Sequence, residues 1–396
     1  MLFWLLKLLH GRVPDWVIAP LQPLYQLEFR AGAAAALAFF IVVLCGRRTI
    51  AQLVRMKVGD TGMTDADALR SGASSKKNTP TMGGVLIAGA MLLAVVLLAD
   101  LSVFYVQASI LVIVWLAVLG GFDDWLKLTA ARRGAGSRQG LRAWEKLIFQ
   151  LGLGLLVGLF AYRHGDAGPG MDLAHVINLP GQRTYVPTLD FAVNEALWYA
   201  SRWVYVTVAI LMIAGMSNAV NITDGMDGLA TGASAVVALG LVILTLISGE
   251  QASAQGLLAP YVNEGGELSV LAGAMLGACL GFLWFNAYPA QVFMGDTGAL
   301  LLGGVIGYIA VIIRQEIVVL MMCGVFLLEI GSVVLQVGCF KATKRFSATG
   351  PKRIFRVAPY HHHLHLGGVA EPKVVTRLWI VAVVLTVLAL VSLKIR

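Results

Sequence analysis

Ten apolar stretches of the sequence are long enough, or nearly so, to cross a lipid bilayer as helices. In lipid every backbone N–H and C=O must be satisfied within the segment, which a helix achieves, and about 20 residues at 1.5 Å per residue cover the hydrocarbon core. The stretches cover residues 31–46, 83–99, 104–121, 145–162, 202–219, 228–248, 268–286, 298–313, 316–340 and 375–393.

Composition supports the same fold class. Hydrophobic residues make up 58% of the chain and charged residues only 13%, about half the charged fraction of an ordinary soluble protein. We therefore predict an all-α, polytopic integral membrane protein with about ten transmembrane helices. Residues 1–30 contain a short apolar stretch that Lys7 interrupts, followed by three prolines, and they are predicted to form an interfacial segment. Residues 31–396 then form a single transmembrane domain.

The basic residues predict the orientation of these helices. The loops after the first, third and ninth stretches hold 20 of the 30 Lys and Arg residues. Cytoplasmic loops of membrane proteins are enriched in Lys and Arg. The loops after odd-numbered stretches are therefore predicted to face the cytoplasm, and both termini to face the periplasm.

Five polar segments fall on the predicted cytoplasmic side. They are residues 75–84, the pair Asp123 and Asp124, residues 218–228, Asn286 with residues 293–296, and residues 359–363. Such clustering favours one composite site over scattered polar loops. Alternatives remain for individual segments: Asp123 and Asp124 could mark where a helix meets water, residues 221–228 could form a tight Asn/Asp/Gly turn, and Phe293 could be a core residue.

The acidic residues of these segments predict a metal site. Asp123, Asp124, Asp224, Asp227 and Asp296 would repel one another if they gathered without a cation. Carboxylate oxygens favour magnesium, which proteins hold with one or two carboxylates together with substrate phosphates. The side of the membrane that carries these residues is therefore predicted to bind Mg²⁺ and a phosphorylated substrate.

Basic and histidine residues in the same segments are typical of a phosphate-binding surface. Lys76 and Lys77 precede two threonines, and His361, His362 and His363 follow Arg353 and Arg356. The lysine segment lacks Walker A spacing, so an NTPase is not indicated. Three consecutive histidines cannot all face one zinc ion from a regular helix or strand. Phosphoryl transfer between a nucleotide-linked diphosphate and a lipid phosphate fits this combination.

Several long motifs resemble a known family. They are SKKNTPTMGG (75–84), GFDDWLK (121–127), SNAVNITDGMDGLA (217–230), FLWFNAYPAQVFMGDTG (282–298), EIGSVVLQV (329–337) and KRIFRVAPYHHH (352–363). From about residue 30 to the C-terminus the chain resembles the phospho-N-acetylmuramoyl-pentapeptide-transferases. These belong to the polyprenyl-phosphate N-acetylhexosamine-1-phosphate transferase superfamily.

The resemblance implies a reaction and its participants. UDP-N-acetylmuramoyl-pentapeptide and undecaprenyl phosphate would give lipid I and UMP with Mg²⁺, as the first membrane step of peptidoglycan synthesis. It also implies a multi-pass protein of the bacterial inner membrane, surrounded by membrane lipids, often a homodimer and without a nucleic-acid partner.

The resemblance also assigns roles to residues that match the family motifs. Asp296 would be the principal magnesium ligand, and Asp123 either the base that deprotonates the lipid phosphate or a residue that assists a covalent intermediate. Asp124 would support the same centre. His361 would be essential for the chemistry or for positioning a phosphate. The implied substrate contacts are Lys76, Thr81, Asn221, Asp224, Asp227, Asn286, Phe293, Gly295, Gln336, His362 and His363, with Phe293 stacking on uracil.

Three residues and one insertion depart from the family pattern. Gln139, Ala299 and His365 replace residues usual in the family, and residues 346–351 form a short insertion. None of these removes a core carboxylate.

The alternative functions are a transferase for another UDP-N-acetylhexosamine and, from a different class, an ion-coupled transporter. Transporters usually hold their charged residues near the bilayer midplane rather than at one face.

Overall fold

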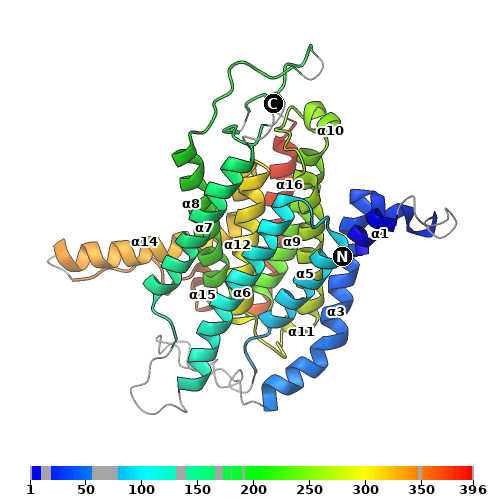
Figure 1. Ribbon diagram of the computed structural model, residues 1–396. Coiled ribbons are helices and arrows are strands. Elements are labelled where there is room, and N and C mark those ends of the chain that lie inside the picture. Colours follow the sequence, from blue (N-terminus) through cyan, green and yellow to red (C-terminus); the bar gives the residue numbers. More distant parts are fainter. Residues whose placement is uncertain are drawn as a thin grey trace.

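The computed structural model describes residues 2–9, 19–55, 79–130, 140–165, 173–179, 181–189, 192–346 and 350–394. Within these ranges the regular structure is helical, and β structure is limited to isolated bridges such as Val176 with Tyr199. Most of the helices stand side by side in one bundle (Figure 1). The all-α prediction is confirmed.

Nine helices in the described part of the chain are long and apolar enough to cross a membrane, which confirms a polytopic membrane protein. They are α3 (Leu27–Arg55), α6 (Phe104–Ala130), α7 (Ala143–Gly165), α8 (Arg202–Thr223), α9 (Leu229–Gly249), α11 (Leu268–Asn286), α12 (Gly295–Ile312), α14 (Gly324–Phe346) and α16 (Glu371–Ser392). The second predicted span is α5 (Gly84–Leu98), whose 15 residues extend about 22 Å and so fall short of the core thickness.

Shorter helices complete the fold. They are α1 (Leu2–Leu9), η1 (Ala19–Tyr25), α10 (Gln251–Gly256), η3 (Gly265–Glu267), α13 (Glu316–Met322) and α15 (Tyr360–His365). Of these, α13 and α15 bear on the site, because they flank the helix that supports the histidine segment.

The ninth predicted span is wrong in one respect: residues 316–340 do not form one helix. The short α13 ends at Met322, Cys323 follows it, and α14 starts at Gly324. Figure 1 shows α14 projecting sideways from the bundle, across the direction of its neighbours. Most of α13 is buried, whereas α14 exposes apolar residues such as Val334 and Leu335. An unbroken apolar run cannot reveal this change of direction, because both helices suit an apolar environment.

Small residues let the central helices pack closely. Helix α12 is buried along nearly its whole length, and it packs against α8 and α6. A Cβ added at Gly307 would lie 2.6 Å from the carbonyl carbon of Met212 in α8, and one added at Gly277 of α11 would lie 2.6 Å from that of Ala35 in α3. Glycine is therefore required at these contacts, as is common where membrane helices associate through small residues.

A charged network ties the N-terminal helix to the bundle. The buried Arg30 of α3 donates two hydrogen bonds to Glu267, at 2.8 and 2.6 Å, and its guanidinium lies 3.9 Å from the ring centroid of Phe3 in α1. Lys7 of α1 forms an ion pair with Asp100, which lies between α5 and α6. This paired geometry compensates the cost of burying the arginine charge.

Candidate functional site

Asp123 and Asp124 lie inside a helix, not at its end. The sequence suggested that the third span ends just before them, but α6 continues to Ala130. Both side chains are buried, at 0% and 3% exposed. The reading in which the two residues mark a helix end in water is therefore wrong, since they face a neighbouring helix.

Asp124 caps the N-terminus of α12. Its Oδ1 accepts a hydrogen bond from the backbone N–H of Asp296 at 3.2 Å, and its Oδ2 accepts bonds from the backbone N–H and the hydroxyl of Thr297, at 3.0 and 2.7 Å. The first N–H groups of a helix have no partner within the helix and carry its positive dipole end, so a carboxylate there is stabilising. Asp124 thus fixes the residue that carries the third carboxylate, Asp296.

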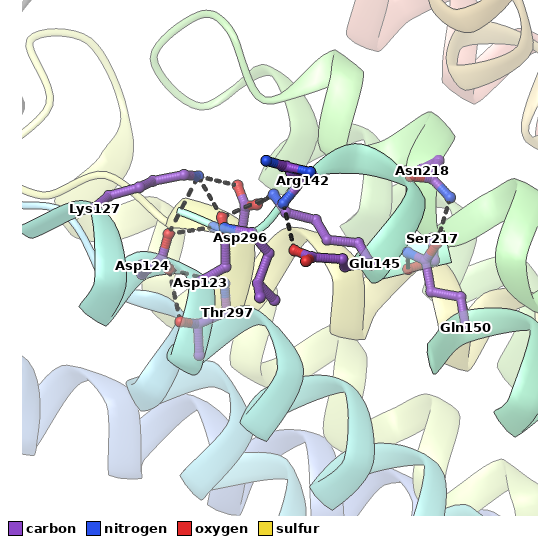
Figure 2. Close-up of polar contacts among 12 residues, drawn as sticks. Asp123, Asp124, Lys127, Arg142, Glu145, Gln150, Ser217, Asn218, Asp296 and Thr297 are labelled. Carbon is purple, nitrogen blue, oxygen red and sulfur yellow. Dashed lines mark hydrogen bonds and ion pairs between the residues drawn. The ribbon is translucent and has the colours of Figure 1, made fainter. Parts of the chain in front are cut away.

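Two lysines lie among the three carboxylates, and Figure 2 labels one of them, Lys127. Lys127, one turn after Asp123 in α6, places Nζ 2.7 Å from Asp123 Oδ2 and 3.2 Å from Asp296 Oδ1. Lys146 of α7 lies 2.7 Å from Asp123 Oδ2 and also forms an ion pair with Asp296. These two ammonium groups balance most of the negative charge and bring α6, α7 and α12 together.

The donor set fits a hard divalent cation. One oxygen each from Asp123, Asp124 and Asp296 lies within 4.8 Å of the others. Mg²⁺ binds oxygen at about 2.1 Å, so two of these carboxylates could share one ion and leave positions for phosphate oxygens or water. All the donors are carboxylate oxygens, and the partly exposed Lys127 marks the side of the site nearest solvent.

The residues before α12 join the first predicted segment to the carboxylates. The backbone N–H of Gly83 donates to the carbonyl of Phe293 at 2.9 Å, and the N–H of Phe293 donates to the carbonyl of Pro80 at 2.8 Å. Gly295 has φ of +71°, and a Cβ there would lie 2.6 Å from Asp124 Oδ2 and 3.0 Å from Thr81 Oγ1. Only glycine suits this position, on both conformational and steric grounds.

Phe293 in the same segment is half-buried, and its backbone bonds to residues on either side of Thr81. Lys76 lies outside the described residues. The structure thus places Thr81, Phe293 and Gly295 together.

The fifth and sixth spans meet in a short turn next to this centre. Asn221 is in the last turn of α8, and Asp224 follows the helix directly. Burial and the neighbouring carboxylates of Asp296 and Asp124 raise the pKa of Asp224 to about 7, although a hydrogen bond with the backbone of Gly295 opposes the shift. Asp224 therefore lies near Asp296 and Asp124 and shares their negative field.

Asp227 and Asn286 hold the adjoining loops in place. Asn286 Oδ1 accepts hydrogen bonds from the Gly228 N–H at 3.2 Å and the Thr231 hydroxyl at 3.0 Å, while its Nδ2 donates to the carbonyl of Val292 at 2.9 Å. Asp227 Oδ2 accepts from a backbone N–H of the α11–α12 loop at 3.0 Å. In this structure both side chains link the α8–α9 turn to the α11–α12 loop, and their contact with substrate stays a prediction.

The histidine segment forms α15 and lies against the α8–α9 turn. His361 is fully buried, and its Nδ1 lies 3.0 Å from Oε2 of Glu329 in α14, which is also fully buried. A Cβ added at Gly225 would lie 3.0 Å from Cε1 of His361 and closer still to its Nε2. The ring of His362 lies next to that of His361, with centroids 4.2 Å apart. The fifth predicted segment therefore reaches the third.

Gln336 shapes the segment that leads into α15. Its Oε1 accepts the backbone N–H groups of Ile354 and Phe355, each at 2.9 Å, and its Nε2 donates to the carbonyl of Phe355 at 3.0 Å. His363 Nδ1 accepts the backbone N–H of Arg356 at 3.1 Å. In the described residues these two side chains bond to backbone, so their expected role toward the sugar and phosphate of a substrate is not tested by these contacts.

Three residues of the site were not singled out from the sequence as site residues: Lys127, Lys146 and Glu329. Lys127 could have been found from its i,i+4 spacing to Asp123. Glu329 could have been found because an acidic residue inside an apolar membrane run is expected to be functional or paired. Lys146 had no such signal, since it is one of several basic residues in its loop and only the packing of α7 against α6 brings it to the carboxylates.

Comparison with known proteins identifies the family. Residues 103–314 match the glycosyl transferase family 4 model, and residues 76–87 match signature 1 of the phospho-N-acetylmuramoyl-pentapeptide-transferases. Curated relatives of that name include one from Chlorobium chlorochromatii, 39% identical over the full length of both chains, and one from Flavobacterium johnsoniae, 37% identical over 93% of this chain and 94% of the relative. A relative of the same name from Parabacteroides distasonis is 38% identical over 93% of this chain and 95% of its own. The resemblance seen in the sequence motifs is confirmed, and the chain belongs to the phospho-N-acetylmuramoyl-pentapeptide-transferase family.

Proposed function

We propose that this chain transfers phospho-N-acetylmuramoyl-pentapeptide from UDP-N-acetylmuramoyl-pentapeptide to undecaprenyl phosphate. The products are UMP and undecaprenyl-diphospho-muramoyl-pentapeptide, which is lipid I. The observation that carries the proposal is the carboxylate triad of Asp123, Asp124 and Asp296, whose oxygens lie within 4.8 Å of one another at the N-terminus of the buried helix α12. The family motifs converge on this point, and family membership supports the transferase reaction.

Asp296 is the residue proposed to hold Mg²⁺, with Asp123 and Asp124 beside it. Both oxygens of Asp124 accept hydrogen bonds from α12, so Asp124 supports the position of Asp296. The metal would neutralise negative charge between the transferred and the leaving phosphates. Lys127 and Lys146 contribute further positive charge next to the same oxygens. A diphosphate entering this site would therefore meet cationic groups from α6 and α7.

Asp123 is the residue proposed to act on the lipid phosphate. Its Oδ1 accepts the backbone N–H of Leu141, and its Oδ2 is held by the two lysines. This anchoring fixes the carboxylate beside Asp296, where it would take a proton from the acceptor phosphate. The alternative is a two-step route in which an aspartate forms a covalent phosphate intermediate.

The remaining motif residues are proposed to bind substrate around the triad. Phe293 stacks on uracil and Gly295 lets the backbone approach the ligand. His361 contacts a phosphate group. The nucleotide would further contact Lys76, Thr81, Asn221, Asp224, Asp227 and Asn286. The sugar and phosphate of the substrate would contact Gln336, His362 and His363.

The site is proposed to open to the cytoplasm in the bacterial inner membrane, with both termini in the periplasm. The Lys- and Arg-rich loops after the first and third spans support this orientation, because such loops stay on the cytoplasmic side. The proposal also includes a homodimer surrounded by membrane lipids. Cysteine accessibility on sealed vesicles would test the orientation, since a residue placed in the loop after α6 should react only once the membrane is opened to the cytoplasmic side.

The reaction is tested by measuring UMP release from detergent-purified protein. The assay supplies UDP-N-acetylmuramoyl-pentapeptide, undecaprenyl phosphate and Mg²⁺, and parallel reactions omit one substrate or add EDTA. We expect UMP only when both substrates and the metal are present. Turnover with UDP-N-acetylglucosamine in place of the muramoyl substrate would instead assign the chain to another N-acetylhexosamine. Metal-independent turnover would refute the magnesium site.

A further inference from the structure

Glu329 is a buried carboxylate inside an apolar membrane helix, and its side chain points at the histidine segment. It lies in α14 and is 0% exposed. Its Oε2 lies 3.0 Å from Nδ1 of His361 and accepts the backbone N–H of the same residue at 3.2 Å. Within the described ranges its other oxygen has no hydrogen-bond partner. Holding a carboxylate in such surroundings is costly, so a specific role is expected.

The contact with Glu329 determines which nitrogen of His361 faces the site. Oε2 of Glu329 already accepts the backbone N–H of His361, so we assign the ring proton to Nδ1, which donates to the same oxygen. The other nitrogen, Nε2, is buried and has no hydrogen-bond partner among the residues that the structure describes. It borders Gly225, where even a Cβ would collide with the imidazole. A polar atom that is buried, unpaired and next to a substrate-binding turn is poised for a ligand.

We propose that Glu329 is a positioning residue that acts through His361. It holds the imidazole in one tautomer and orientation, with Nε2 directed past Gly225 toward the substrate. An anionic phosphate at Nε2 is bound most strongly by the cationic ring, whose N–H would donate a charge-assisted hydrogen bond. The carboxylate of Glu329 then balances the buried positive charge on the ring. This inference rests on the proposed function, because it takes the ligand at Nε2 to be a phosphate of the substrate.

The pair of Glu329 and His361 lies on different helices from the carboxylate triad. Asp123, Asp124 and Asp296 lie at the junction of α6 and α12, whereas Glu329 and His361 approach the α8–α9 turn from α14 and α15. Because α14 turns away from the bundle after Cys323, the first turns of this helix lie near α8 and also support α15. The break between α13 and α14 therefore places a membrane-helix carboxylate beneath the histidine segment.

A double-mutant cycle tests whether Glu329 acts through His361. The variants are Glu329→Gln, His361→Asn and the pair, with Ser332→Ala as a control, since Ser332 is buried one turn along α14 and bonds only to the backbone carbonyl of residue 329 in the described structure. We expect Glu329→Gln to lower kcat on the order of 10-fold or more with a smaller change in KM for the nucleotide substrate, while the control keeps its activity. In the His361→Asn background the second substitution should have almost no further effect. Equal losses in both backgrounds, or full activity of Glu329→Gln, would overturn the proposal.

A second measurement separates this inference from the reaction itself. Protein labelled with ¹⁵N at histidine reports by NMR which ring nitrogen carries the proton, and the His361 signal is recognised by its loss in His361→Asn. We expect a protonated Nδ1 in the unaltered protein and a changed signal in Glu329→Gln. An unprotonated Nδ1 would overturn the positioning role even if UMP release proceeds. If UMP release fails in the unaltered protein while the NMR result holds, the error lies in the assigned substrate pair.

Discussion

Replacing Gly120 with Ala tests whether the site depends on the close approach of α6 and α12. Gly120 lies one turn before the two aspartates of α6. A Cβ there would lie 2.5 Å from the carbonyl carbon of Asp296 and 2.6 Å from Cα of Thr297, and closer still to the Asp296 carbonyl oxygen. Ordinary contacts begin near 3.4 Å. The obstacles are backbone atoms, which cannot rotate away.

The two helices would therefore have to separate by roughly 1 Å, and a displacement of that size at a catalytic centre costs about 10²-fold in rate. Overpacking should also lower the free energy of unfolding by about 1–3 kcal/mol. We expect Gly120→Ala to fold but to release UMP about 10²-fold more slowly at saturating substrates. The loss should be in kcat, because the substitution moves the carboxylates on α6 away from Asp296 and leaves Phe293 in place.

The next residue provides a matched control. A Cβ on Gly121 would lie 3.7 and 3.9 Å from side-chain atoms of Thr297, which is ordinary contact. Alanine is also favoured over glycine within a helix by roughly 0.5–1 kcal/mol. Gly121→Ala should therefore keep full activity and unfold at the same or a slightly higher temperature. UMP release and thermal unfolding in detergent measure both variants side by side. Full turnover by Gly120→Ala, or equal damage from both substitutions, would refute the packing argument.

Three further predictions concern single side chains. Asp296→Asn should abolish magnesium-dependent UMP release with little change in thermal unfolding, because Asp123 still pairs with the lysines; normal turnover would contradict the metal role. Phe293→Ala should weaken binding of uridine ligands by about 1–3 kcal/mol in calorimetry, and an unchanged affinity would make Phe293 a packing residue only. Arg30→Met should leave the partly buried Glu267 without its arginine partner and destabilise the protein by about 1–3 kcal/mol while kcat is kept below the unfolding temperature. An unaltered unfolding midpoint would show that the charge network contributes nothing to stability.

The all-α fold and the grouping of the motifs could be predicted from the sequence. An apolar run long enough to cross a bilayer can only be a helix or part of a closed barrel. Because each span crosses the membrane, every second loop lies on the same side of it. This is why the segments of Thr81, Asp124, Asp224, Asp296 and His361 were expected together, and the structure brings these segments to one site.

Other features depended on which helices are neighbours. Membrane helices are apolar on nearly every face, so their sequence pattern does not say which face packs inward or against which partner. Only the tertiary structure brings Lys146 of α7 to the carboxylates and makes Asp124 the cap of α12. Only the break at Cys323, hidden in one continuous apolar run, places Glu329 against His361. The sequence by itself determined most of the helices and the residues available for chemistry. Which of those residues touch was decided by lateral packing, since backbone approach between helices depends on contacts far apart in the chain.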